Sequence, residues 1–172
     1  SSFSKTVASS ASSFVKSMAL MVAATFGLQK GITTLMDFDD ARARVVGLAG
    51  LKGNDVNKLT ASALKIGGST EFSGTDVMSA FAITARTIKD VKEIEAITKV
   101  QTNLASLGQT TITDIAQNST ALVGILGLNS KNIQNFGDTV AQMSTKNSAS
   151  ITSNLEAMTI AIPMMQAYGQ TF

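Results

Sequence analysis

The sequence predicts an all-α protein in which a long N-terminal coiled-coil helix precedes a bundle of about six or seven shorter helices. Three observations lead to this fold class. Apolar residues recur at spacings of three and four along nearly the whole chain, which is the period of a helix buried on one face. Glycines and small polar residues divide this pattern where helices end and begin. No stretch of useful length alternates apolar and polar residues as a strand does.

The first pattern is a coiled-coil seam in residues 1–36. Its apolar row consists of Phe3, Val7, Ala11, Phe14, Met18, Met21, Thr25, Leu28, Ile32 and Leu35. As one helix, this stretch would extend for about 50 Å at about 1.5 Å per residue. The positions beside the seam hold Val15, Val22 and Ala24, whereas a two-stranded zipper places Glu and Lys there. We therefore expect either three or more helices to pack together along this seam or one helix to pack inside a larger wall.

A second interpretation applies to residues 18–28, which are apolar on nearly every side. They provide about half of the roughly 20 residues that a bilayer-spanning helix needs. Extension to Met36 brings in Gln29 and Lys30. A membrane-perturbing or pore-forming helical protein is therefore the alternative, and the pattern does not decide whether residues 18–36 enter a membrane.

An acidic cluster, Asp37, Asp39 and Asp40, follows the seam. A calcium-binding loop would need a Glu where Leu48 stands. We interpret the cluster as the first turn of a new helix, where the positive end of the helix dipole stabilises acids. The chain then divides into an oligomerising helix, residues 1–36, and a helical core domain, residues 37–172.

The clearest helix junction spans residues 67–76. Gly67 and Gly68 can take the left-handed backbone that closes a helix. Ser73 is placed to cap the next helix, and Asp76 stands where it completes a capping box. We expect one helix to end at Gly67 and the next to begin near Gly74.

The other core helices follow from the same rules. They are expected at about residues 37–51, 54–66, 90–107, 111–126, 130–143 and 150–165. Their predicted N-terminal caps are Asn54, Asp90 with Glu93, Thr111 with Asp114, Asn129 or Ser130, and Ser150. Their predicted buried faces include Leu48, Leu107 and Ile125. Pro163 lies inside the last helix and removes one backbone hydrogen bond there.

The composition argues against several function classes. The chain has no Cys and no His, so it lacks thiolate ligands and the commonest general base. A net charge of +2 with scattered Lys and Arg does not predict sequence-specific binding of nucleic acid. We find no phosphate-binding loop, no nucleophile elbow and no metal-ligand spacing. We expect no enzyme, no catalytic residue, no cofactor and no metal site.

A series of motifs carries a resemblance from about Phe38 to Gly169. In chain order they are a helix with Phe38 and Val45, the turn at Gly67–Asp76, Ala80-Phe81-Ala82, a helix from Glu93 to Leu107, Leu126-Gly127-Leu128, Asn135-Phe136-Gly137-Asp138, Ser148 to Ser153, Ile162-Pro163 and Tyr168-Gly169. This ordered set resembles the core region of phage tail tape measure proteins of the TP901 type. Ala85-Arg86-Thr87 departs from the family, which usually has an Ala-Gly pair there.

The resemblance implies a structural protein of the virion, located inside the tail, in the tube lumen or at the tip. Such a protein sets the tail length during assembly and is released at genome ejection, from a phage or a related phage-tail-like particle. It implies a homo-oligomer, with a trimer favoured and a hexamer as the other choice. The implied partners are tail tube proteins and tail tip or baseplate hub proteins, with transient contact with the host membrane at ejection.

Overall fold

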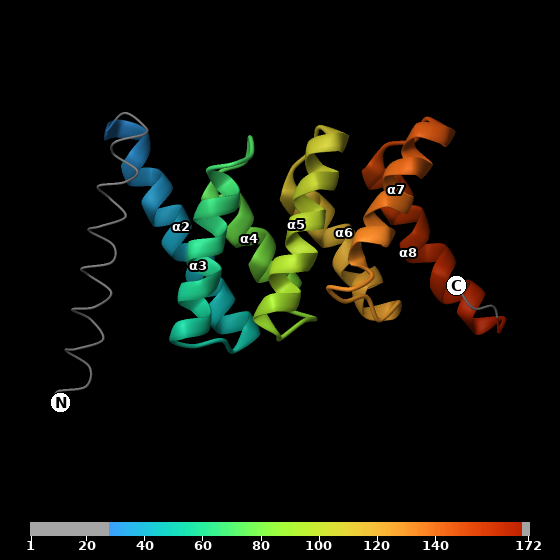
Figure 1. Ribbon diagram of the computed structural model, residues 1–172, viewed down its shortest axis with the longest axis horizontal. Coiled ribbons are helices and arrows are strands. Elements are labelled where there is room, and N and C mark those ends of the chain that lie inside the picture. Colours follow the sequence, from blue (N-terminus) through green and yellow to red (C-terminus); the bar gives the residue numbers. More distant parts are fainter. Residues whose placement is uncertain (1–27, 170–172) are drawn as a thin grey trace. The chain divides into compact units, whose positions relative to one another are not determined.

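The computed structural model describes residues 28–169, with side chains from Met36 onward. The all-α class is confirmed for this part, which contains seven helices and no strand (Figure 1). The chain divides into two compact units, residues 1–40 and 41–172, and each is considered by itself. Of the long coiled-coil helix predicted for residues 1–36, only residues 28–36 belong to the described part, so the coiled coil stays a prediction.

Helix α2, Leu28–Ala49, passes through the acidic cluster without a break. The prediction that a helix begins at Asp37 was therefore wrong. Phe38, Ala41 and Val45 are buried and recur at helical spacing, so the apolar row already runs through the cluster, whose acids are exposed. Leu48 falls off this row and is 42% exposed, contrary to prediction.

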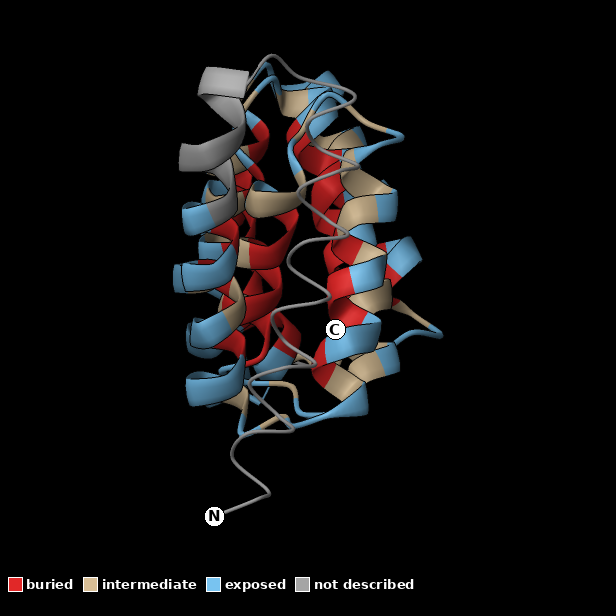
Figure 2. Ribbon diagram, turned by 90° about the vertical axis from the view of Figure 1, so that its left-hand side faces the viewer, coloured by how far each residue is buried: buried red, intermediate tan, exposed pale blue. Residues whose placement is uncertain are grey.

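The six helices that follow form two layers. They are α3 (Asn54–Gly67), α4 (Gly74–Thr84), α5 (Val91–Gly108), α6 (Ile112–Ile125), α7 (Ile133–Asn147) and α8 (Ile151–Ala167). In one layer α5 packs between α3 and α7, and in the other α6 packs between α4 and α8. Consecutive helices, such as α3 and α4, pack across the two layers. Buried residues fill the space between the layers (Figure 2).

The helix pairs α3–α4, α5–α6 and α7–α8 repeat one another in register. The buried positions that correspond between the odd-numbered helices are Val56, Leu59, Thr60 and Ala63 in α3, Ile94, Ile97, Thr98 and Gln101 in α5, and Ile133, Phe136, Gly137 and Val140 in α7. Successive sets lie 38 and 39 residues apart, counted from Val56 to Ile94 to Ile133. Three stacked helix pairs of this size are typical of helical-repeat proteins.

The even-numbered helices show the same repeat. The buried residues Val77, Met78, Phe81, Ala82, Thr84 and Ala85 around α4 correspond, 38 residues later, to Ile115, Ala116, Ser119, Thr120, Leu122 and Val123 in α6. The repeat was not predicted. A signal existed in the three cap segments, Ser73-Gly74-Thr75-Asp76, Thr111-Ile112-Thr113-Asp114 and Ser150-Ile151-Thr152-Ser153, which have the same spacing.

The junction between α3 and α4 is confirmed, but Gly67 acts differently from the prediction. Ser73 Oγ accepts a hydrogen bond from Asp76 N at 3.1 Å, and Asp76 Oδ2 accepts one from Ser73 N at 2.9 Å, which completes the capping box. Gly68 has φ −74°, so the backbone there is right-handed. A Cβ on Gly67 would lie 2.5 Å from Gly74 N, so close backbone approach is what requires glycine.

The remaining caps are partly confirmed. Asp90, Thr111 and Ser150 cap their helices as predicted. Asn54 does not act as a cap, because Gly53 occupies that position without a side-chain hydrogen bond. The last predicted cap site, Asn129 or Ser130, lies in the turn before Asn132, which directly precedes α7.

Glu93 was predicted to complete a capping box, and it binds elsewhere. Its carboxylate accepts hydrogen bonds from Ser130 N and from Ser130 Oγ, the latter at 2.8 Å. It thus joins the start of α5 to the turn before α7. Leu107 and Ile125, predicted as buried, are 69% and 39% exposed. The adjacent Gly108 and Gly124 lie against Ile151 and Thr87, so both helices are packed at these ends, but on a side that Leu107 and Ile125 do not occupy.

Candidate interaction surfaces

The predicted oligomer seam cannot be placed in the described structure. Its positions from Phe3 to Thr25 lie outside the described residues. Leu28, Ile32 and Leu35 lie in α2, but side chains are described only from Met36 onward. The seam therefore stays a prediction.

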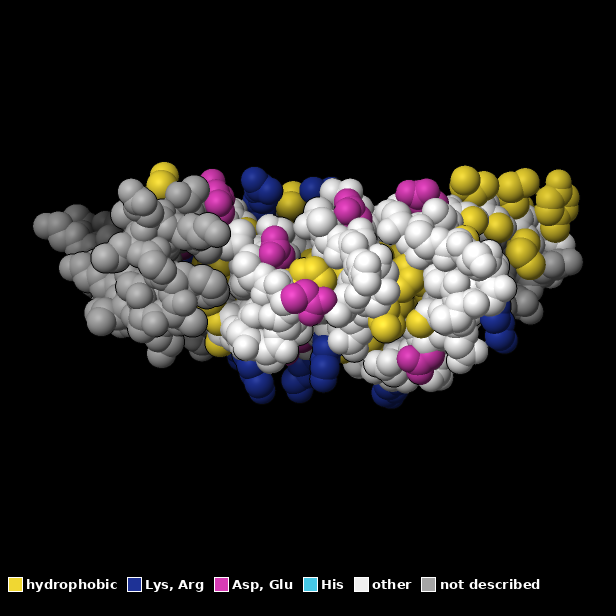
Figure 3. Space-filling view, turned by 90° about the horizontal axis from the view of Figure 1, so that it is seen from above, with side chains coloured by type: hydrophobic (Ala, Val, Ile, Leu, Met, Phe, Trp, Pro, Cys, Tyr) yellow, Lys and Arg dark blue, Asp and Glu magenta, His cyan; other side chains and the backbone are white. Residues whose placement is uncertain are grey.

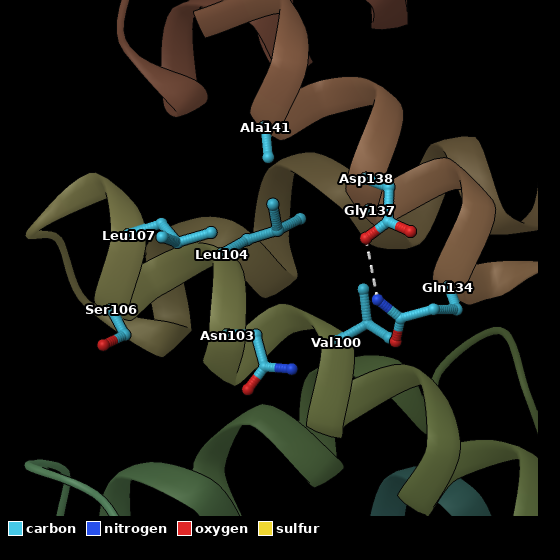
Figure 4. A pocket seen from close by; sticks show the side chains of 9 residues that line it. All are labelled: Val100, Asn103, Leu104, Ser106, Leu107, Gln134, Gly137, Asp138 and Ala141. Carbon is cyan, nitrogen blue, oxygen red and sulfur yellow. Dashed lines mark hydrogen bonds between the residues drawn. The ribbon is translucent and has the colours of Figure 1, made fainter. Parts of the chain in front are cut away.

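A groove of about 420 Å³ lies between α5 and α7 (Figure 4). Its lining consists of Val100, Asn103, Leu104, Ser106, Leu107, Gln134, Gly137, Asp138 and Ala141. Gly137 sets the approach of the two helices, because a Cβ there would lie 2.5 Å from Val100 Cγ1. The groove lies beside this contact, and the side chain of Leu107, which lines it, is exposed to solvent.

Three polar side chains of the groove, Gln134, Asp138 and Ser106, have hydrogen-bond partners. Gln134 Nε2 donates to Asp138 Oδ1 at 2.9 Å. The Ser106 hydroxyl donates to the carboxylate of Glu71, and this bond lowers the pKa of Glu71 below 4.5. Asp138 is the one titratable side chain in the lining, so the groove offers no acid–base pair of the kind that general acid–base catalysis uses.

A buried polar cluster joins α4, α5 and α6 around Gln101, which is 1% exposed. Thr84 Oγ1 donates to Gln101 Oε1 at 3.1 Å, and Gln101 Nε2 donates to Ser119 Oγ at 3.0 Å. Thr120 Oγ1 accepts a further bond from Gln101 Nε2 at 3.4 Å. Every side-chain polar atom of Gln101 has a partner. The cluster therefore fixes the register of three helices and leaves no group free for a ligand.

An apolar surface covers the outer side of α8. Ile160, Met164 and Tyr168 are 68%, 56% and 83% exposed and follow one another at four-residue steps. Figure 3 shows hydrophobic side chains gathered at this end of the helix array. An exposed apolar stripe on one helix is typical of a protein-binding surface.

The described residues hold neither a metal site nor a membrane span. Among residues 36–169, acidic side chains do not gather into a group able to hold a metal ion. No helix between residues 28 and 169 combines the length and the hydropathy that crossing a bilayer requires.

The comparisons with known proteins give no relatives for this chain. No family model matches it, and neither a curated protein nor a solved structure matches it significantly.

Proposed function

We propose that this chain is a structural tail tape measure protein of a phage or a phage-tail-like particle. It would lie in the lumen or at the tip of the tail tube, set the tail length during assembly, and leave at genome ejection. The proposal includes a homo-oligomer, most simply a trimer held by the seam of residues 1–36, in contact with tail tube and baseplate hub proteins.

The observation that carries the proposal is the order of the motifs between Phe38 and Gly169. The structure shows what two of these motifs do in the fold. The turn at residues 67–76 is a complete capping box with a glycine that packing requires. Gly127, in the segment after α6, has φ +61°, a conformation that favours glycine. These two motifs are helix junctions, whereas Ala80-Phe81-Ala82 lies inside α4 and Ile162-Pro163 lies inside α8, so the ordered set follows a succession of helices.

The test is an in-frame insertion of four heptads into the seam, made in the particle that encodes the chain. The heptads follow the period of the seam, so they lengthen the helix without changing its packing. If the seam lies along the tube, the tail lengthens by about 42 Å at about 1.5 Å per residue. Electron micrographs of negatively stained particles measure this length directly.

The control is an insertion of equal length that is rich in Gly and Ser, placed in the loop at Gly50, where the backbone is already left-handed. A flexible loop outside the seam should leave the tail length unchanged or alter it by a different amount. Tails of normal length in particles that incorporate the heptad insertion would refute the tape measure role.

A further inference from the structure

If the repeat packing continued, another helix would pack against the outer side of α8. This side is identified by comparing α8 with the equivalent positions of α4 and α6. Thr159 Oγ1 of α8 donates to Asn118 O of α6 at 3.3 Å, so Asn118 marks the side of α6 that receives α8. A Cβ on Gly124 of α6 would lie 3.0 Å from Thr87 Cγ2, which follows α4, so Thr87 marks the side of α4 that receives α6.

Equivalent positions of α8 lie at the open end of the array. The receiving positions are Ala80, Thr84 and Thr87 for α4, Asn118, Leu122 and Ile125 for α6, and Ala157, Ala161 and Met164 for α8. Ala80 and Thr84 are fully buried, whereas Ala157 and Ala161 are exposed. With Ile160 and Tyr168, these α8 residues form the surface that we call the α8 face.

The chemistry of the α8 face selects its partner. Glu156 is the only charged residue of α8, and it precedes the face. The exposed sides of α3, α5 and α7 carry Lys58, Lys65, Lys92, Lys99 and Lys146. Packing the α8 face against one of these sides would bury a charge without a partner, which is unfavourable. The matching surface is a helix face without charge that combines small and large apolar residues, and the α8 face is itself such a surface.

We propose that the α8 face binds the α8 face of a second copy of this chain. In a twofold contact the same patch lies on both sides, so the face must complement itself. Ala157 and Ala161 allow close approach of the two helices, and Ile160, Met164 and Tyr168 supply the apolar area. The contact adds a helix beside α8 in the layer α4–α6–α8, but it joins two identical sides, whereas neighbouring helices within the layer join different sides. It would form whether or not the protein belongs to a phage tail.

The size of the α8 face determines how stable the proposed dimer is expected to be. One helix face buries less than the roughly 800 Å² per partner of a stable complex. We therefore expect a dimer whose population rises with protein concentration in the micromolar range.

The absence of Cys from the chain permits a direct test with single cysteines. Ala161→Cys and Met164→Cys lie in the middle of the face, near the twofold axis. A lone cysteine can form a disulfide only with its counterpart in another copy, and only when the two Cα atoms lie within about 4.4–6.8 Å. Mild oxidation of the full chain should convert at least one of these variants largely into a covalent dimer. Leu107→Cys is the matched control, because Leu107 is 69% exposed, somewhat more than Met164 at 56%, but lies on α5.

A second measurement separates this contact from assembly through the seam. Met164→Lys places a charge on the face and should weaken the concentration-dependent association in sedimentation relative to the original chain, whereas Leu107→Lys should not. Both variants keep residues 1–36, so any association through the seam is the same in both. Circular dichroism verifies that the variants fold. Equal cross-linking at positions 107, 161 and 164, or equal association of the two Lys variants, would overturn the proposal.

Discussion

Helices in the middle of the array and the helix at its open end have the same repeat register but differ in how far their side chains are buried. In the middle, α4 and α6 are covered on several sides, and the polar groups that become buried there are paired around Gln101. At the end, α8 packs against α5, α6 and α7 and presents uncharged apolar residues on its outer side. The repeat register is the same in both places. The two places differ in whether another helix packs against them. Because none packs against the outer side of α8 in the described chain, the side chains there are exposed.

The largest expected change in stability comes from shortening a buried side chain in the middle of the helix array. Phe81 in α4 is fully buried, so Phe81→Ala leaves a cavity and should lower the free energy of unfolding by about 3–5 kcal/mol. Met164→Ala in the open α8 face should change it by less than about 0.5 kcal/mol. Urea denaturation followed by circular dichroism measures both at one low protein concentration. Equal losses would mean that the two regions do not differ.

The polar cluster gives the next effect. Gln101→Leu keeps the volume but leaves the buried hydroxyl of Thr84 without its amide acceptor, so unfolding should require about 1–3 kcal/mol less. Gln117→Leu, on the exposed side of α6, is the matched change of residue type and should be within about 0.5 kcal/mol of the original chain. Denaturation curves compare the two, and a neutral Gln101→Leu would show that the cluster is dispensable.

The N-terminal caps of α4, α6 and α8 are equivalent in the repeat, so they allow a further comparison between the middle and the end of the array. Ser73→Ala removes the acceptor of Asp76 N and should destabilise by about 0.5–2 kcal/mol. Thr111→Ala in the next repeat should have a similar effect on global unfolding. Ser150→Ala acts on the end helix, so its effect should appear mainly as faster amide hydrogen exchange in α8. Identical global effects at all three sites would contradict the distinction between middle and end.

The smallest effect is a pH dependence at the edge of the groove. The hydroxyl of Ser106 holds the pKa of Glu71 below 4.5, so this bond stabilises the fold above that pH and is lost as the pH falls through the lowered pKa. Ser106→Ala should lower the melting temperature slightly at about pH 7, and the difference should shrink and vanish as the pH falls through the lowered pKa of Glu71. Thermal melts over this pH range measure it. A difference that persists or grows at low pH would exclude this bond as its source.

Local signals predicted much of the fold. Caps are read from a few adjacent residues, which is why Ser73, Thr111 and Ser150 were placed correctly. Signals that depend on distant residues were misread. The role of Gly67 depends on the backbone of Gly74 across the turn, and Glu93 binds Ser130, 37 positions further along the chain. Neither partner is visible in a local pattern.

The candidate surfaces were less predictable than the helices. The repeat is conserved in position rather than in residue type, since Ala63, Gln101 and Val140 occupy equivalent buried sites. In α8, Ile160 and Met164 have the same apolar character as buried Ile162, and only the packing shows which of them face outward. The predicted seam falls outside the described residues, so its register stays a prediction.

The stacking of helix pairs has a mechanical consequence. The pairs α3–α4 and α7–α8 each pack against the central pair α5–α6, so the array is held together mainly by neighbour contacts. Pulled from its carboxyl end, such an array would peel apart from α8 inward, shedding one pair after another under modest force. A molecule that comes apart in steps can pass through an opening narrower than its folded width.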